Sequence, residues 1–305
     1  RGSQSIALIE RSGEVKPFAL PPGPYAFPRI SPNGKSIVFG TDDGKEAIVW
    51  IYDLSGASSM RRLTFGGANR FPIWSADGER VAFQSDREGD LGIFWQRADG
   101  TGTAERLTKS EKGGEHIPDS WSPDGQRFSF TAVKGNERAV WIFSLPDKKA
   151  TLFAAVPSSN LGSSAFSPDG KWLAYHSNET SRYEIFVQPF PPTGTKYQIS
   201  KDAQSHNPLW SPDGKELFYI PGPDQFLRVS LTTKPSFTFS NAVPVPRRFI
   251  EFGPPVPRTY DITPDGKRFV GIIAAGQTQT ATPAASQIQV VLNWFEELKR
   301  RVPVR

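Results

Sequence analysis

The chain has 305 residues, with 36 Lys and Arg against 31 Asp and Glu, and a formal net charge of +5 at pH 7. It contains no Cys, which excludes disulfide bonds, thiolate metal ligands and Cys nucleophiles. No apolar run reaches the roughly 18 residues that a membrane-spanning helix needs. A transmembrane segment is therefore not expected. The basic residues are scattered along the chain and do not form one cluster, so a nucleic-acid ligand is not expected either.

The sequence predicts short strands from end to end. Two apolar runs, residues 6–10 and 15–20, precede six similar repeats. Each repeat has an apolar run, a tight turn and further apolar runs rich in aromatic and β-branched residues, which is typical of strands. The first strands start near residues 26, 70, 116, 162, 206 and 258. The third strands are expected at residues 48–52, 92–95, 140–143, 184–187, 226–229 and 288–292.

The turn between the first two strands is the same in every repeat. It begins with Ser or Thr, ends with Gly and recurs at intervals of 44 to 52 residues, at 31–34, 75–78, 122–125, 167–170, 211–214 and 263–266. Pro at the second position of most copies fixes φ, and Gly takes the place where φ can be positive. A strand-rich repeat of this length is typical of a β-propeller. The sequence therefore predicts one all-β domain over residues 1–305, a six-bladed propeller of four-stranded antiparallel blades.

The two ends of the chain are expected to close the ring. One or both of the N-terminal strands within residues 5–20 would complete the last blade, but one strand is surplus, and which terminal strand takes which place is left open. Val291, Phe295 and Leu298 recur at helical spacing, and basic residues follow them, which predicts a short C-terminal helix.

The repeat resembles that of the TolB-type propellers. The resemblance is carried by Pro72-Ile73-Trp74-Ser75-Ala76-Asp77-Gly78, then Val81-Ala82-Phe83, Ile93-Phe94-Trp95 and Arg106-Leu107-Thr108. Residues 183–191 and the tail 291–300 are similar to the C-terminal propeller of bacterial serine/threonine protein kinases. This resemblance implies an extracytoplasmic sensor or interaction domain joined to a kinase, although no kinase motif occurs in these residues.

Candidate site residues gather where the first strands begin. Two positions before the proline, or its counterpart, the repeats carry Ala26, Arg70, His116, Gly162, His206 and Arg258. If these positions ring one mouth of the central channel, then Arg70, His116, His206 and Arg258, with Asp119 and Asp261 nearby, form a candidate site for a small molecule, an anion or a peptide carboxylate. The alternative is that each side chain bonds a neighbouring loop or water.

The function expected from these features is binding without catalysis. No cofactor is expected, and a structural calcium held by Glu115, Asp119 and Asp261 is left open. The sequence has no Gly-x-Ser-x-Gly elbow and no His-Glu-x-x-His frame, which speaks against a serine hydrolase and a catalytic zinc site. Two other interpretations remain: a lyase or hydrolase with a histidine-based or divalent-ion site in the channel, and a pure scaffold. We expect a monomer.

Overall fold

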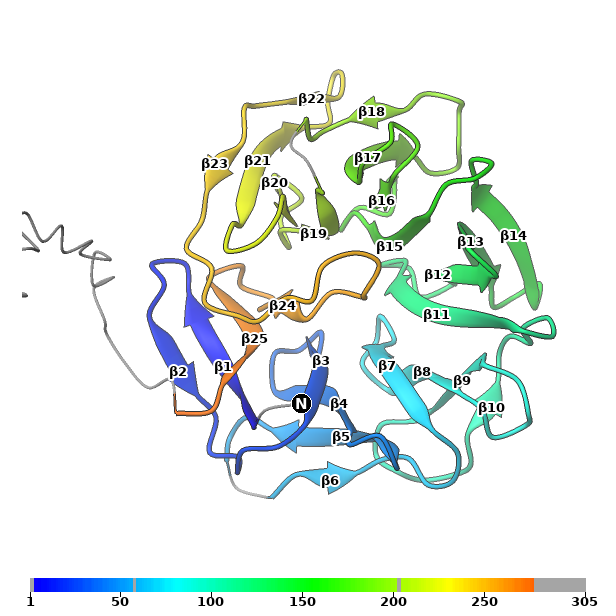
Figure 1. The fold of residues 1–305 in the computed structure, drawn as a ribbon, viewed down its shortest axis with the longest axis vertical. Helices are drawn as coiled ribbons and strands as arrows, with labels where there is room; N and C mark the ends of the chain where they lie inside the picture. Colours follow the sequence, from blue (N-terminus) through cyan, green and yellow to red (C-terminus); the bar gives the residue numbers. More distant parts are fainter. Residues whose placement is uncertain (1–2, 57–58, 202–203, 277–305) are drawn as a thin grey trace, which may run out of the picture.

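The computed structural model describes residues 3–56, 59–201 and 204–276, and these residues form a closed ring of six antiparallel sheets around a central axis (Figure 1). In this part of the chain, every regular element is a strand. No helix among these residues is long and apolar enough to cross a membrane. The predicted all-β, six-bladed propeller is confirmed.

The first five blades follow the chain, with the first strand innermost. Blade 1 contains β3 (Tyr25–Ile30), β4 (Ser36–Asp42), β5 (Ala47–Asp53) and β6 (Arg61–Arg62). Blade 2 contains β7 (Asn69–Trp74), β8 (Arg80–Ser85), β9 (Gly92–Arg97) and β10 (Glu105–Arg106). Blade 3 contains β11 (Gly114–Trp121), β12 (Arg127–Lys134), β13 (Glu137–Ser144) and β14 (Lys149–Ala154). Blade 4 contains β15 (Leu161–Phe166), β16 (Trp172–Ser177), β17 (Glu184–Pro189) and β18 (Tyr197–Gln198). Blade 5 contains β19 (His206–Trp210), β20 (Glu216–Ile220), β21 (Leu227–Thr232) and two short outer strands, β22 (Thr238–Phe239) and β23 (Val243–Pro244).

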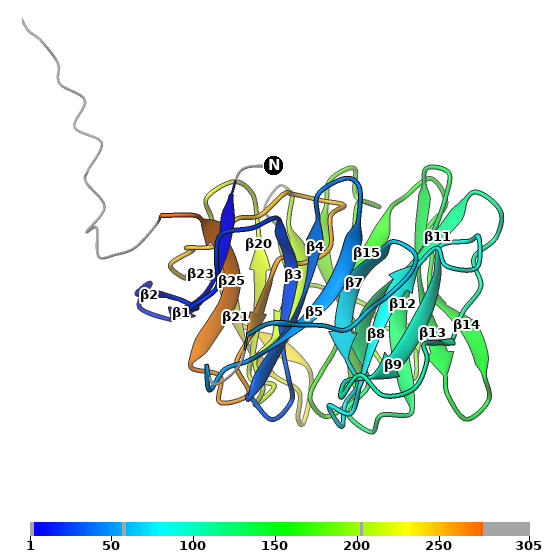
Figure 2. The ribbon, with the colours of Figure 1, turned by 90° about the horizontal axis from the view of Figure 1, so that it is seen from below.

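The sixth blade joins the N-terminal strands to the last repeat. Its order is β24 (Tyr260–Ile262), β25 (Arg268–Ala274), β1 (Gln4–Glu10) and β2 (Val15–Pro17). The seven residues of β1 all pair with β25, and Figure 2 shows β1 and β2 beside it. Both N-terminal strands are therefore used. The third place of this blade, next to β25, is taken by β1. Residues 288–292 and the predicted C-terminal helix lie outside the described residues.

Apolar side chains pack between neighbouring blades in six clusters. The cluster between blades 5 and 6 contains Phe218, Phe226 and Phe269, each exposed by 1% or less. Recurring Trp side chains link the innermost strands of neighbouring blades: Trp74 Nε1 donates to the Arg29 carbonyl, and Trp210 Nε1 donates to the Ala165 carbonyl. Packing between neighbouring blades therefore provides most of the core.

The six repeated turns form a continuous ring around one mouth of the channel. Their glycines all have φ of +70° or +71°. A Cβ on any of these glycines would lie within 3.7 Å of the neighbouring blade's turn, against its Pro or, for Gly125, against Ala76. Within the turns, the Ser31 hydroxyl donates to Asn33 and accepts from the Ser36 amide, and the other blades repeat this pattern. The repeated sequence thus fixes both the local turn and the contact between turns.

We expect Gly170→Ala to destabilise the propeller more than Gly44→Ala does. Both glycines have positive φ, which costs an L-residue about 1–2 kcal/mol. A Cβ on Gly170 would also lie 3.1 Å from Pro123, whereas no atom lies within 4 Å of a Cβ on Gly44. Urea unfolding of the two variants measures the difference, and equal losses would contradict a role for contact between turns.

Candidate functional site

The channel opens on the side of the repeated turns into a cavity of about 410 Å³. The ends of the innermost strands form its wall, and its lining includes Trp74, Trp121 and Trp210 at equivalent places in three blades. Four charged side chains line the same cavity: Arg29, Asp119, Arg258 and Asp261. The cavity therefore combines aromatic walls with a charged inner end. We call it the channel cavity.

Arg29 is a buried cation in the channel cavity. It is 8% exposed, and it donates to the carbonyls of Pro28 at 2.8 Å and Arg258 at 2.9 Å. Among the described residues, its Nε has no hydrogen-bond acceptor, and no carboxylate lies within ion-pair distance of its guanidinium. Burial and the neighbouring Arg258 cation lower the pKa of Arg29 to about 9. The site thus holds a positive charge that lacks a direct counter-charge.

The two carboxylates of the channel cavity are bonded elsewhere. Asp119 accepts from the Thr131 hydroxyl at 2.8 Å and from both the amide and the hydroxyl of Ser164, at 3.1 and 2.7 Å. Burial nevertheless raises the pKa of Asp119 to about 6. Asp261 accepts from the Ile30 amide at 3.0 Å and lies 3.6 Å from Arg258. These bonds tie the innermost strands of neighbouring blades together.

Residues 250–258, which we call the strap, cross the opposite mouth of the channel (Figure 1). The Asn207 amide group donates to the Val256 carbonyl and to Glu251 Oε1, both at 3.1 Å. From blade 3, Arg138 donates to the Pro255 carbonyl at 3.4 Å. The strap therefore bridges blades 3, 5 and 6.

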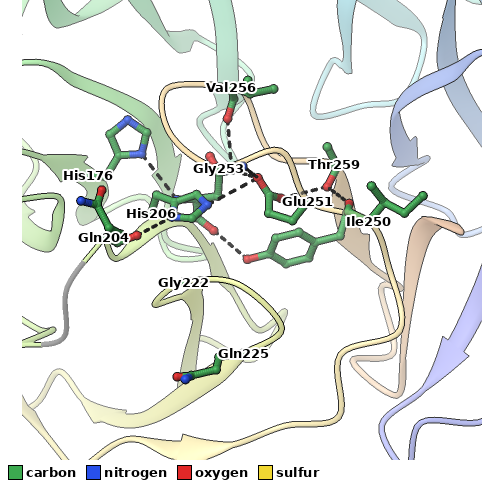
Figure 3. A network of polar contacts seen from close by, with 12 residues as sticks. His176, Gln204, His206, Gly222, Gln225, Ile250, Glu251, Gly253, Val256 and Thr259 are labelled. Carbon is green, nitrogen blue, oxygen red and sulfur yellow. Dashed lines mark hydrogen bonds and ion pairs between the residues drawn. The ribbon is translucent and has the colours of Figure 1, made fainter. Parts of the chain in front are cut away.

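Glu251 is the buried anchor of the strap. Its side chain is 3% exposed and accepts from the Thr259 hydroxyl at 2.9 Å and the Gly253 amide at 3.2 Å. Figure 3 shows His206 beside it, with Nε2 3.4 Å from Glu251 Oε1. Because His206 Nδ1 donates to the Gln204 carbonyl, Nε2 completes an ion pair with Glu251 only in the imidazolium form.

The predicted site residues do not converge on one site. Arg258, Asp119 and Asp261 line the channel cavity. Arg70 pairs with Asp42 at 2.8 Å, and His206 is buried beneath the strap. His116 lines a separate lateral groove and bonds Thr108 through Nδ1 at 2.8 Å; burial lowers its pKa to about 4.

Sequence reasoning missed Arg29, Asn207 and Glu251. The signal for Glu251 is the longer interval before the last turn, since the strap occupies the extra residues. Arg29 directly follows a repeat proline, where other repeats carry the apolar Ile73 and Leu209 but also the charged Asp119, so the repeat pattern does not single it out. Within the described residues, no three His, Asp or Glu side chains are grouped as metal ligands.

No family model matches the chain. Comparison with known proteins finds relatives that carry different names. The chain is 29% identical over 177 residues to the Tol-Pal system protein TolB of Francisella tularensis, covering 56% of this chain and 38% of that protein. It is 27% identical over 199 residues to the uncharacterised peptidase YuxL of Bacillus subtilis, covering 63% and 28%. It is 25% identical over 166 residues to the uncharacterised protein Atu1656 of Agrobacterium fabrum, covering 53% and 54%. The match thus spans between 28% and 54% of the length of these relatives.

Solved structures share the fold. A putative TolB from Agrobacterium tumefaciens superposes with a TM-score of 0.67 at 18% identity, covering 90% of this chain and 98% of that one. TolB from Acinetobacter baumannii gives 0.60 at 20% identity, covering 80% and 63%. An oligogalacturonate lyase from Vibrio parahaemolyticus gives 0.57 at 10% identity, covering 87% and 76%. These likenesses concern the fold alone. Together with the repeat sequence and the TolB relatives, they identify the chain as a TolB-like β-propeller.

Proposed function

We propose that this propeller is a non-catalytic protein-binding module that receives an acidic group of its partner in the channel cavity. The observation that carries the proposal is Arg29, a buried guanidinium with no carboxylate in contact among the described residues. A buried charge without a partner is costly, and a carboxylate from a ligand would offset that cost.

The surroundings of Arg29 suit a carboxylate on a polypeptide. Arg258 approaches the same cavity and adds a second guanidinium, and arginines bind carboxylates through paired hydrogen bonds. The Trp side chains of the wall offer the aromatic surface that is common in protein recognition. The cavity of about 410 Å³ has room for one or two side chains of a partner segment.

We also propose a context for the module. The resemblance to kinase-linked propellers, and the partial coverage of the curated relatives, support a role as the interaction domain of a larger bacterial protein. An extracytoplasmic location, a kinase as the attached domain and a monomeric state follow from the same resemblance and remain proposals.

The catalytic alternative has less structural support. Its histidine-based form requires histidines in the channel, yet His116 lies in the lateral groove and His206 lies beneath the strap. Its divalent-ion form requires grouped ligands, and no three His, Asp or Glu side chains are grouped within the described part of the chain. The support for catalysis is the similarity to YuxL and to the lyase, since propellers host many activities. We propose binding because Arg29 has no carboxylate in direct contact among the described residues, which calls for a ligand and not for proton transfer.

The proposal is tested with peptides selected from a random display library on the immobilised chain. We expect the selected peptides to contain Asp, Glu or a free C-terminal carboxylate, and to bind Arg29→Met at least about tenfold more weakly, as loss of a charged hydrogen bond implies. Because Arg29→Met leaves the Pro28 and Arg258 carbonyls without a donor, circular dichroism must first show that the variant folds. Arg61→Met removes the same charge from the exposed strand β6 and serves as the control. Equal binding to both variants, or no selected peptide, would refute the proposal.

A further inference from the structure

The outer strand of blade 3 is unlike those of the other blades. β14 has six residues, whereas β2 has three and β6, β10, β18, β22 and β23 have two each. Figure 1 shows β14 as a long arrow at the rim of the ring. Short outer strands limit pairing with other chains, so five blades are protected in a way that blade 3 is not.

The free edge of β14 is regular enough to accept another strand. Within the described residues, β14 pairs with β13 alone. Lys149, Ala150, Thr151 and Leu152 are in continuous register with β13, and the register shifts only after them, at Phe153. Lys149, Thr151 and Leu152 are exposed, Leu152 by 53%. Alternate amide and carbonyl groups along such an edge point away from the sheet, where an extended chain can bond them.

An apolar groove lies next to this edge. The lateral groove has a volume of about 740 Å³, and its lining includes Trp141, Ala150 and Leu152 from β13 and β14. Leu152 is directly opposite Trp141 in the register. Phe130, Ala132 and Ala139 continue the lining on the same face of the blade, since Phe130 pairs with Trp141 and Ala132 pairs with Ala139. Small alanines beside a Trp leave room for an added apolar side chain.

The charges around the edge favour an acidic partner. Lys109, Lys134, Arg138, Glu111 and Glu137 line the groove, and Asp147, Lys148 and Lys149 lie at the turn into β14 and at its start. Five cations therefore face three carboxylates, and one of these carboxylates, Glu111, is paired with Lys134. Burial keeps the pKa of His116 near 4, so its ring adds no positive charge at neutral pH.

We propose that β14 is a docking edge to which an extended, acidic segment of a partner protein adds as a fifth strand of blade 3. Backbone hydrogen bonds to β14 hold the segment, and one of its apolar side chains enters the lateral groove beside Trp141 and Leu152. This surface goes beyond the function proposed above, because it uses the outer edge of one blade instead of the channel.

The probe is a fluorescein-labelled peptide of eight residues, Glu-Thr-Val-Thr-Val-Thr-Val-Glu, added to the whole chain and followed by fluorescence anisotropy. We expect saturable binding, with new protection of the residue 149–154 amides in hydrogen exchange. A peptide N-methylated at alternate residues loses one hydrogen-bonding edge and should bind at least about tenfold more weakly. A peptide with Lys in place of both Glu residues should also bind more weakly.

Leu152→Glu removes an apolar side chain from the edge and adds a negative charge, which repels an acidic segment. Because Leu152 is exposed, the variant should fold normally, and its affinity for the acidic peptide should fall at least about tenfold. Phe239→Glu, at an exposed position of β22, is the matched control and should bind like the parent chain. Unchanged binding by Leu152→Glu or by the N-methylated peptide would overturn the proposal. A concentration-dependent dimer that Leu152→Glu abolishes would also overturn it, since the edge would then belong to a second copy.

Discussion

Replacing Phe226 by Ala is expected to lower the free energy of unfolding by about 3–5 kcal/mol, the usual cost of truncating a fully buried Phe. Phe226 is 1% exposed and lies at the junction of blades 5 and 6. Its ring centroid is 5.7 Å from that of Phe218, 5.2 Å from that of Phe269 and 5.1 Å from that of Tyr260. Because blade 6 is assembled from both ends of the described chain, a cavity here weakens the closure of the ring.

Urea unfolding, followed by Trp fluorescence, measures this effect. Phe65→Ala removes a side chain that is 69% exposed and should change stability by less than about 0.5 kcal/mol. Similar losses in the two variants would show that the junction of blades 5 and 6 does not limit stability.

Asp119→Asn is expected to remove a pH-dependent penalty on folding. The pKa of Asp119 in the folded chain is about 6, against an ordinary value of 3.8. Well below pH 3.8 the carboxyl is neutral in both states and does not affect the free energy of unfolding. As pH rises towards 6, the unfolded chain loses this proton first, so folding becomes less favourable, by roughly 3 kcal/mol once pH exceeds 6. Asn keeps the acceptor for Thr131 and Ser164 without the charge.

The comparison of the two proteins across pH isolates this contribution. Buried His116 and His176 have lowered pKa values and destabilise the fold as pH falls below about 6.5, in both proteins alike. Arg29, Arg258 and Asp261, the other charged groups of the channel cavity, are also unchanged. The stability of Asp119→Asn relative to the parent should therefore rise between pH 4 and pH 7. A constant difference across this range would mean that Asp119 ionises normally.

The two binding surfaces use different parts of the same scaffold. The channel cavity depends on side chains that converge from several blades, whereas the β14 edge depends on backbone groups of one blade. A partner segment bound at one surface need not alter the other. Separate substitutions, Arg29→Met and Leu152→Glu, therefore test them independently.

The sequence by itself determined the fold, because each repeat contains the turn residues and the apolar runs that specify its own turn and strands. The repeated turns, which begin with Ser or Thr, end in a Gly that can adopt positive φ, and φ is near +70° at all six glycines. The strand that closes the ring could not be predicted from such local signals. Pairing between β1 and β25 joins residues more than 250 positions apart, and a local pattern cannot choose between β1 and residues 288–292 for that place.

Only the tertiary structure decided which side chains meet. Four innermost strands, β3, β7, β15 and β19, each have a β-bulge near the repeat proline or its counterpart. One residue in each bulge has positive φ: Phe27, Phe71, Ser163 and Asn207. A bulge redirects the side chains around it, so equivalent sequence positions no longer point the same way. In β19 the bulge directly follows His206, whereas β11 is regular at His116 and its register shifts only after Pro118, so the two histidines do not occupy equivalent places. Arg29 follows the bulge of β3 and lines the channel cavity. Repetition determined the scaffold, whereas its local irregularities determined the candidate sites.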